Sequence, residues 1–310
     1  MTPVPADVLV ARALAGDRRS LARAITLVEL RVAAVGEALA EVPVRRRTQP
    51  GAPHVIGLTG PPGAGKSTFA DRLIGRARAE GQRVAVIAID PSSPFSGGAI
   101  LGDRVRMEAH TGDEGVYLRS LSNRGHHGGL SGATAEVVDL LDAAGFDLVL
   151  VETVGVGQSE LSVMEVADTV VVVLTPESGD AVQTLKAGLL EVADLFVVNK
   201  ADRPGARRLA RDLERSVELD GAPWEAPVLL AAAAKDEGVD AVLEAARDHL
   251  AWIVGPGLES WRVRRGDALV RLYLDLVGDT ARDGARRHLD AGLEADLRAL
   301  RITPHQAASR

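Results

Sequence analysis

The chain has 310 residues, of which 46% are hydrophobic and 25% are charged, and its formal net charge at pH 7 is −7. This is the composition of an ordinary globular protein, and the acidic balance argues against nucleic acid as the main partner. Because the sequence contains no cysteine, it excludes disulfides, CxxC metal sites and thiol nucleophiles.

No apolar run approaches the length that spans a membrane, and the first residues lack the layout of a signal peptide. We therefore expect a cytoplasmic protein with neither a membrane nor a nucleic acid as its partner.

The N-terminal part of the chain is predicted to be helical over residues 5–42. Its apolar residues recur at intervals typical of one helical face: Leu21, Ile25, Val28, Val32, Val35 and Leu39. Residues 43–53 contain three arginines and a Gln-Pro-Gly turn, which favours a solvated linker over an anion-binding segment. We expect residues 1–50 to form a helical extension with its linker.

Residues 51–254 alternate apolar strands with helical segments. Strands are predicted at 54–59, 83–89, 116–119, 147–152, 169–175, 194–198 and 226–231. Helices are predicted between them, for example at 131–144, 181–192 and 205–218. This alternation predicts an α/β fold with a mostly parallel central sheet, helices on both faces, and ligands at the carboxyl ends of the strands.

The pattern becomes purely helical after Gly255-Pro256-Gly257. Two amphipathic helices at the end of the chain need a partner for their apolar faces, either the α/β domain or a second copy of the chain. The Pro-Gly punctuation favours a helical arm over residues 255–310, which packs on a second copy.

A phosphate-binding loop follows the first strand and precedes a helical stretch, the context that the G-x-x-x-x-G-K-[ST] pattern requires. Its residues are Gly60, Pro61, Pro62, Gly63, Ala64, Gly65, Lys66, Ser67 and Thr68. Glycines let backbone N–H groups turn inward around phosphate oxygens. Lys66 is expected to reach the β- and γ-phosphates, and the Ser67 hydroxyl to bind Mg²⁺.

The base is predicted by Asn199-Lys200-Ala201-Asp202, an N-K-x-D pattern at the end of a late strand. The Asp202 carboxylate can accept hydrogen bonds from guanine N1–H and N2–H₂, whereas adenine offers no such pair of donors. An unpaired buried carboxylate costs on the order of 1–3 kcal/mol or more, which is a source of discrimination. The sequence thus predicts GTP or GDP as the bound nucleotide.

Further carboxylates stand at the ends of other strands. Glu152 follows an apolar strand and is expected to hold Mg²⁺ directly or through water, while the Gly155 N–H senses the γ-phosphate. Asp90 and Asp103 bracket a Ser- and Gly-rich loop and are candidates for the same magnesium and catalytic site. Gln158 is equally an orienter of water or a solvated residue.

A second Gly-rich loop contains the adjacent histidines His126 and His127 between Arg119 and the next helix. Adjacent loop histidines without a carboxylate cluster favour a polar loop over a metal site. Arg119 and Arg124 are better candidates for contacts with phosphate or with a partner.

These stretches resemble the MeaB/ArgK/MMAA family of GTPases, in the SIMIBI class of phosphate-loop proteins. The resemblance covers residues 54–202 and is carried by 60–68, 90–98, 100–103, 124–125 with 128–131, 151–160 and 199–202. It implies a homodimeric chaperone for an adenosylcobalamin-dependent acyl-CoA mutase, typically methylmalonyl-CoA mutase. Nucleotide binding and hydrolysis would gate cofactor loading and protect or reactivate the mutase.

The resemblance also implies roles for residues. Lys66, Ser67, Asp90, Asp103 and Glu152 would form the phosphate and Mg²⁺ site, and residues 176–186 would form a switch that responds to the partner. Two positions depart from the family: His127 stands where an apolar residue is usual, and the loop that supports guanine reads Ala-Ala-Ala-Ala-Lys over 231–235 instead of containing Ser-Ala. A backbone N–H to guanine O6 survives the second change.

Two other uses of the same phosphate loop compete with this interpretation. A metal-insertion GTPase would be expected to show Cys and His residues that handle the metal, and this chain has no cysteine and 7 scattered histidines. A small-molecule kinase usually binds adenine, which the Asn199–Asp202 pattern argues against.

Overall fold

The computed structural model describes residues 4–30, 32–42, 51–90, 110, 112–122, 132–153, 163–177, 192–220, 222–261 and 263. The chain divides into two compact units, Met1–Arg265 and Gly266–Arg310, and only the first contains described residues. The greater part of the predicted C-terminal arm therefore lies outside the described residues.

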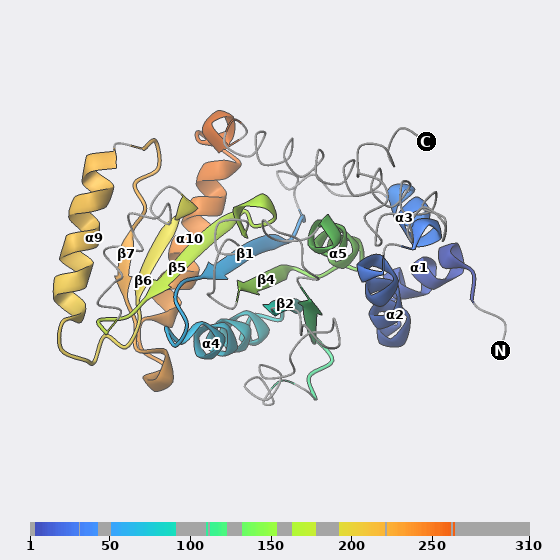
Figure 1. The fold of residues 1–310 in the computed structure, drawn as a ribbon, viewed down its shortest axis with the longest axis horizontal. Coiled ribbons are helices and arrows are strands. Elements are labelled where there is room, and N and C mark those ends of the chain that lie inside the picture. Colours follow the sequence, from blue (N-terminus) through green and yellow to red (C-terminus); the bar gives the residue numbers. More distant parts are fainter. Residues whose placement is uncertain are drawn as a thin grey trace, which may run out of the picture. The chain divides into compact units, whose positions relative to one another are not determined.

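The described part is built on a seven-stranded parallel sheet in the order β3-β2-β4-β1-β5-β6-β7 (Figure 1). The strands are β1 (His54–Thr59), β2 (Val84–Asp90), β3 (Val116–Ser122), β4 (Leu148–Thr153), β5 (Thr169–Leu174), β6 (Leu195–Val198) and β7 (Val228–Leu230). The predicted parallel α/β sheet is confirmed, and every pairing between its strands is parallel.

The sheet is apolar on both faces because helices cover both. Successive residues of a strand point to opposite faces, and each face has its own core. Val149 and Val151 of β4 belong to the core under α5 (Gly132–Ala143) and α9 (Ala206–Asp220). Leu148 and Leu150 belong to the core under α4 (Lys66–Ala79) and α10 (Val239–Ile253).

Three helices precede the sheet: α1 (Ala6–Leu14), α2 (Arg18–Glu29) and α3 (Ala33–Ala40). α2 begins after Asp17, whose carboxylate accepts hydrogen bonds from the backbone N–H groups of Arg19 and Ser20. The prediction that residues 5–42 form helices is confirmed, and this cap marks the start of the second of them. The described residues also include two short 3₁₀ turns, η2 (Val163–Glu165) and η4 (Ala233–Lys235).

The N-terminal helices are tied to the edge strand β3. The Arg18 guanidinium donates to the carbonyls of Glu114 at 2.9 Å and Val116 at 2.6 Å. Arg119 of β3 forms an ion pair with Glu29 of α2, with 2.6 Å between Nη2 and Oε2. Arg119, predicted as a contact for phosphate or a partner, is thus engaged between strand and helix. No helix among the described residues is long and apolar enough to cross a membrane.

Candidate nucleotide site

The loop between β1 and α4 has a backbone that requires glycine. Gly60 has φ +133°, and a β-carbon there would lie 2.1 Å from the carbonyl oxygen of Val173. Gly65 has φ +89°, and a β-carbon there would lie 2.5 Å from Nδ2 of Asn199. The loop leads directly into α4, so its N–H groups and the positive end of the helix dipole converge where an anion can bind.

Lys66 is the first residue of α4 and is buried, with 5% of its surface exposed. Its ammonium folds back over the loop and donates to the carbonyl of Gly60 at 2.6 Å and to that of Pro61 at 3.1 Å. Pro62, Gly63 and Thr68 are exposed around it. The positive charge is therefore placed over the same loop that offers backbone donors to phosphate.

Ser67 and Glu152 meet across the site, from the start of α4 and the end of β4. The Ser67 hydroxyl donates to Oε1 of Glu152 at 2.6 Å, and both residues are buried. Beside them, the Thr153 hydroxyl donates to Thr59 Oγ1 at 3.1 Å and so ties the end of β4 to the end of β1. Two buried oxygen groups from separate elements converge here.

This oxygen pair fits the chemistry of Mg²⁺, which prefers carboxylate and hydroxyl ligands and retains several waters. Ser67 and Glu152 are the described residues that would hold the ion. When bound, Mg²⁺ neutralises the charge of the β- and γ-phosphates. Asp90 is the last residue of β2, which pairs with β4, but its side chain lies outside the described residues, as do Asp103 and Gly155.

Asn199 joins the phosphate loop to the loop after β7. Its side-chain N–H donates to the carbonyl of Ala64 at 2.8 Å, and its Oδ1 accepts from the backbone N–H of Ala233 at 3.1 Å. The residue is 3% exposed. One buried amide thus fixes the distance between two loops that lie at the carboxyl edge of the sheet.

Asp202 lies a short distance beyond Asn199 and is partly exposed. Its Oδ2 lies 2.9 Å from Nζ of Lys235. The hydrogen bond from Lys235 lowers the pKa of Asp202 below its ordinary value, so Asp202 is a carboxylate at neutral pH. An ionised carboxylate accepts hydrogen bonds and donates none, which suits a ligand edge that carries two donors.

Lys200 has a left-handed backbone, with φ 55°. Its Nζ lies 3.5 Å from Oε2 of Glu177, and Arg203 also forms an ion pair with Glu177. Both cations belong to the segment around Asp202, whereas Glu177 follows β5. The segment that contains the predicted base-binding residues is thus connected to the start of residues 176–186, of which only 176 and 177 are described.

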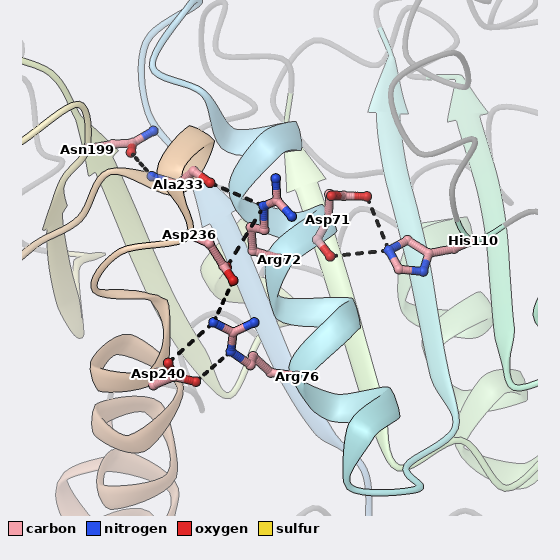
Figure 2. A network of polar contacts seen from close by, with 8 residues as sticks. All are labelled: Asp71, Arg72, Arg76, His110, Asn199, Ala233, Asp236 and Asp240. Atoms are coloured by element: carbon pink, nitrogen blue, oxygen red, sulfur yellow. Dashed lines mark hydrogen bonds and ion pairs between the residues drawn. The ribbon is translucent and has the colours of Figure 1, made fainter.

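A polar network joins α4 to the loop after β7, on the side of that loop opposite Asn199 (Figure 2). The sequence did not predict it. Arg72 and Arg76 of α4 contact the loop after β7 and the start of α10 through Ala233, Asp236 and Asp240. The only signal in the sequence was the position of Ala231–Lys235 after the next strand. His126 and His127 lie outside the described residues, within which no group of three or more His, Cys, Asp or Glu could hold a metal ion.

Comparison with known proteins places this geometry in context. A family model described as methylmalonyl Co-A mutase-associated GTPase MeaB matches residues 21–285. A Pyrococcus horikoshii relative that is named as a GTPase is 49% identical over 252 residues, which cover 79% of this chain and 78% of the relative. The GTPase ArgK of Escherichia coli is 38% identical over 248 residues, covering 78% of this chain and 75% of the relative.

A mouse relative is named methylmalonic aciduria type A homolog, mitochondrial. It is 38% identical over 251 residues, which cover 75% of this chain and 60% of the relative. Among solved structures, a crystal structure of a protein titled LAO/AO transport system kinase matches with a TM-score of 0.67 at 27% identity. That match covers 100% of this chain and 97% of the other.

Proposed function

This chain belongs to the MeaB family of methylmalonyl-CoA mutase-associated GTPases and is a GTPase, and on that premise we propose a specific site and role for it. GTP binds with Mg²⁺ at the carboxyl edge of the sheet. The loop Gly60–Thr68 and Lys66 hold the phosphates. Ser67 and Glu152 hold Mg²⁺, together with Asp90 and Asp103. Gly155 senses the γ-phosphate.

Asn199 and Asp202 are proposed to select guanine. The observation that carries this is the bridge made by Asn199, because one buried side chain bonds both the phosphate loop and the loop beside Asp202. With the phosphates seated on the first loop, the base lies near the second. Guanine satisfies the Asp202 carboxylate with N1–H and N2–H₂, whereas adenine leaves it without donors at a cost on the order of 1–3 kcal/mol.

The protein is further proposed to act as a chaperone for an adenosylcobalamin-dependent acyl-CoA mutase, with methylmalonyl-CoA mutase as the first candidate. Its nucleotide state would gate cofactor loading and protect or reactivate the mutase. The family description and the name of the mouse relative support this choice. The contacts of Lys200 and Arg203 with Glu177 support a link between the base site and residues 176–186.

Two properties of the whole molecule complete the proposal. The protein acts as a homodimer through its C-terminal arm, and it works in the cytoplasm without nucleic acid. The purely helical pattern after residue 255 supports the first, and the net charge of −7 supports the absence of a nucleic acid partner.

The test is GTP turnover by the purified protein, alone and with a cobalamin-dependent mutase from the same source. Phosphate is measured as the free ion, since a kinase would leave it on an acceptor. We expect release of free phosphate, stimulation by the mutase, and turnover by Lys66→Ala that is lower by about a hundredfold or more under either condition. Turnover that no mutase alters would contradict the proposed partner and leave the GTPase itself in place.

A further inference from the structure

Two arginines of α4 contact the loop after β7 from the side opposite Asn199 (Figure 2). Nε of Arg72 donates to the carbonyl oxygen of Ala233 at 3.2 Å. Nη2 of Arg76 lies 3.0 Å from the Asp236 carboxylate, and its Nε donates to Asp240 at 2.6 Å. Arg72 also approaches Asp236, at 3.9 Å. The arginine side chains of α4 therefore hold the loop after β7, and Arg72 does so at a backbone carbonyl of that loop.

The contact of Arg72 has a geometric consequence for the next peptide group. The carbonyl of Ala233 and the N–H of Ala234 belong to one peptide, and the described chain contains no cis peptide. In a trans peptide these two groups point in opposite directions. Because the carbonyl of Ala233 faces Arg72, the N–H of Ala234 points away from α4. Within the described residues, this N–H donates to no protein acceptor.

The neighbours of Ala234 on either side are held at the proposed base site. The N–H of Ala233 donates to Asn199 at 3.1 Å, and Nζ of Lys235 lies 2.9 Å from Asp202. Guanine O6 is bonded to the ring carbon next to N1. A base whose N1–H faces Asp202 therefore presents O6 beside that carboxylate, where an N–H group from residues 233–235 can reach it.

We propose that Arg72 is a positioning residue for guanine recognition, which directs the Ala234 N–H at O6 by holding the Ala233 carbonyl. This rests on the proposed function of Asp202 in reading guanine. Arg76 assists by holding Asp236, whose own N–H donates to the same carbonyl at 3.1 Å. Asp236 keeps a left-handed backbone, with φ 62°, and the two ion pairs with Arg76 and Arg72 restrain it.

The competing explanation is that these arginines merely join α4 to α10. A control exists for it, since Arg247 of α10 forms an ion pair with Glu80 at the other end of α4 and, within the part of the chain that the structure describes, makes no hydrogen bond or ion pair with the loop. Arg247→Gln removes a cation that joins α10 to the end of α4, whereas Arg72→Gln removes a cation that joins α4 to the loop after β7. The two variants should differ in nucleotide recognition if Arg72 positions the loop, and should not differ otherwise.

The experiment measures calorimetric affinities of wild type and variants for three nucleotides. GDP carries every guanine group, IDP lacks the N2 amino group but keeps O6, and 6-thio-GDP keeps both donors but replaces O6 with a weak sulfur acceptor. We expect Arg72→Gln to weaken GDP and IDP alike by about five- to tenfold, the loss of one hydrogen bond. The same variant should weaken 6-thio-GDP less than about twofold.

Arg76→Gln should show the same dependence on O6 with a smaller loss, and Arg247→Gln should bind all three nucleotides as wild type does. The side chain of Arg72 is 39% exposed, so we expect Arg72→Gln to fold. Should it unfold, Arg76→Gln makes the same comparison. Equal losses for all three nucleotides, or no loss for GDP, would overturn the inference.

Failure of the proposed base site gives a different result. If Asp202 does not read guanine, wild-type protein will bind GDP and IDP equally well, because the N2 amino group then has no partner. If Asp202 reads guanine but Arg72 does not position the loop, wild type will prefer GDP and Arg72→Gln will lose nothing that depends on O6.

Discussion

The two edges of the sheet both carry buried polar groups, but they use them differently. At the carboxyl edge, Lys66 contacts its own loop, Ser67 contacts the end of β4, and Asn199 contacts the phosphate loop, and exposed residues of the phosphate loop lie beside them. At the amino edge, the polar groups form a closed network. His54 contacts the Thr169 hydroxyl at 2.8 Å, and the same hydroxyl contacts His249 at 2.9 Å.

The network at the amino edge is completed by two carboxylates. Nε2 of His249 lies 3.3 Å from Asp194, whose other oxygen accepts the backbone N–H of Val170 at 2.8 Å. Asp168 accepts the N–H of Val55 at 2.9 Å in the same way. These carboxylates satisfy backbone donors at the starts of β5 and β1, so the network fixes the strands and offers no loop to a ligand.

The comparison of the two edges shows that the burial of polar residues does not by itself identify a ligand site. Both edges hold ionisable groups with almost no exposure, yet only the carboxyl edge combines them with glycine-dependent backbone and converging N–H groups. Disrupting the amino edge should lower stability and spare nucleotide binding. Disrupting the carboxyl edge should weaken nucleotide binding and leave the stability of the fold nearly unchanged.

The largest effect is expected from His249→Ala at the amino edge. It removes the imidazole that contacts both Thr169 and Asp194, and each buried polar group left without its hydrogen bond costs about 1–3 kcal/mol of the free energy of unfolding. Denaturant unfolding should show this loss, while the folded variant should bind GDP within about twofold of wild type. His110→Ala, at a half-buried pair with Asp71, is the matched control with a smaller loss. A variant as stable as wild type would contradict the structural role of this edge.

Lys66→Ala should have the converse effect at the carboxyl edge. Removing the ammonium deletes the main positive charge over the phosphate loop, so GTP turnover should fall by about a hundredfold or more. The free energy of unfolding in the absence of nucleotide should change by less than about 1 kcal/mol, because the carbonyls of Gly60 and Pro61 that accept from the ammonium are neutral groups of the same loop. Turnover near the wild-type rate would remove Lys66 from the phosphate site.

Asp202→Asn tests base reading with a smaller expected change. The amide replaces an acceptor with a donor, so affinity for GDP should fall by roughly thirtyfold, about 2 kcal/mol. Xanthosine diphosphate, which carries an oxygen at position 2, should gain affinity from the new N–H group. Calorimetric titration of both nucleotides checks the exchange, and a variant that loses both equally would argue for a general loss of structure.

The smallest effect is a dependence of stability on pH that belongs to the amino edge. Burial lowers the pKa of His54 from 6.5 to about 4. Between these values the unfolded chain binds a proton that the folded chain does not, so stability is complete above pH 6.5 and falls as the pH drops towards 4. The slope should be about 1 kcal/mol per pH unit. His54→Asn should flatten the curve in urea unfolding at these pH values, and an unchanged slope would assign it to another group.

The sheet could be predicted from sequence where strands are continuous apolar runs. β1 has the predicted bounds, because an unbroken apolar run stops at the phosphate loop. β3 was predicted to end at residue 119 but continues to Ser122, since Ser120 and Ser122 pair with Ala88 and Asp90 of β2. Serine has a weak strand preference of its own, so the partner strand and not the local sequence sets this end.

In the candidate site, too, some residues could be predicted from the sequence and others could not. Residues within motifs, such as Lys66 and Asn199, could be named in advance because their spacing along the chain defines the loop. Contacts between elements could not be predicted: Arg72 and Ala233 are 161 residues apart, and Arg72 belongs to no motif. The histidine network at the amino edge likewise has no pattern in the sequence, since His54 and Thr169 meet through the pairing of β1 with β5, and His249 reaches them from α10.

The most direct test of the central claim is a calorimetric titration of the wild-type protein with GDP, IDP and ADP at neutral pH. The account predicts that GDP binds best, that IDP binds roughly tenfold more weakly because Asp202 loses the N2 donor, and that ADP binds weakest of the three. ADP bound as tightly as GDP would contradict a carboxyl edge built to read guanine.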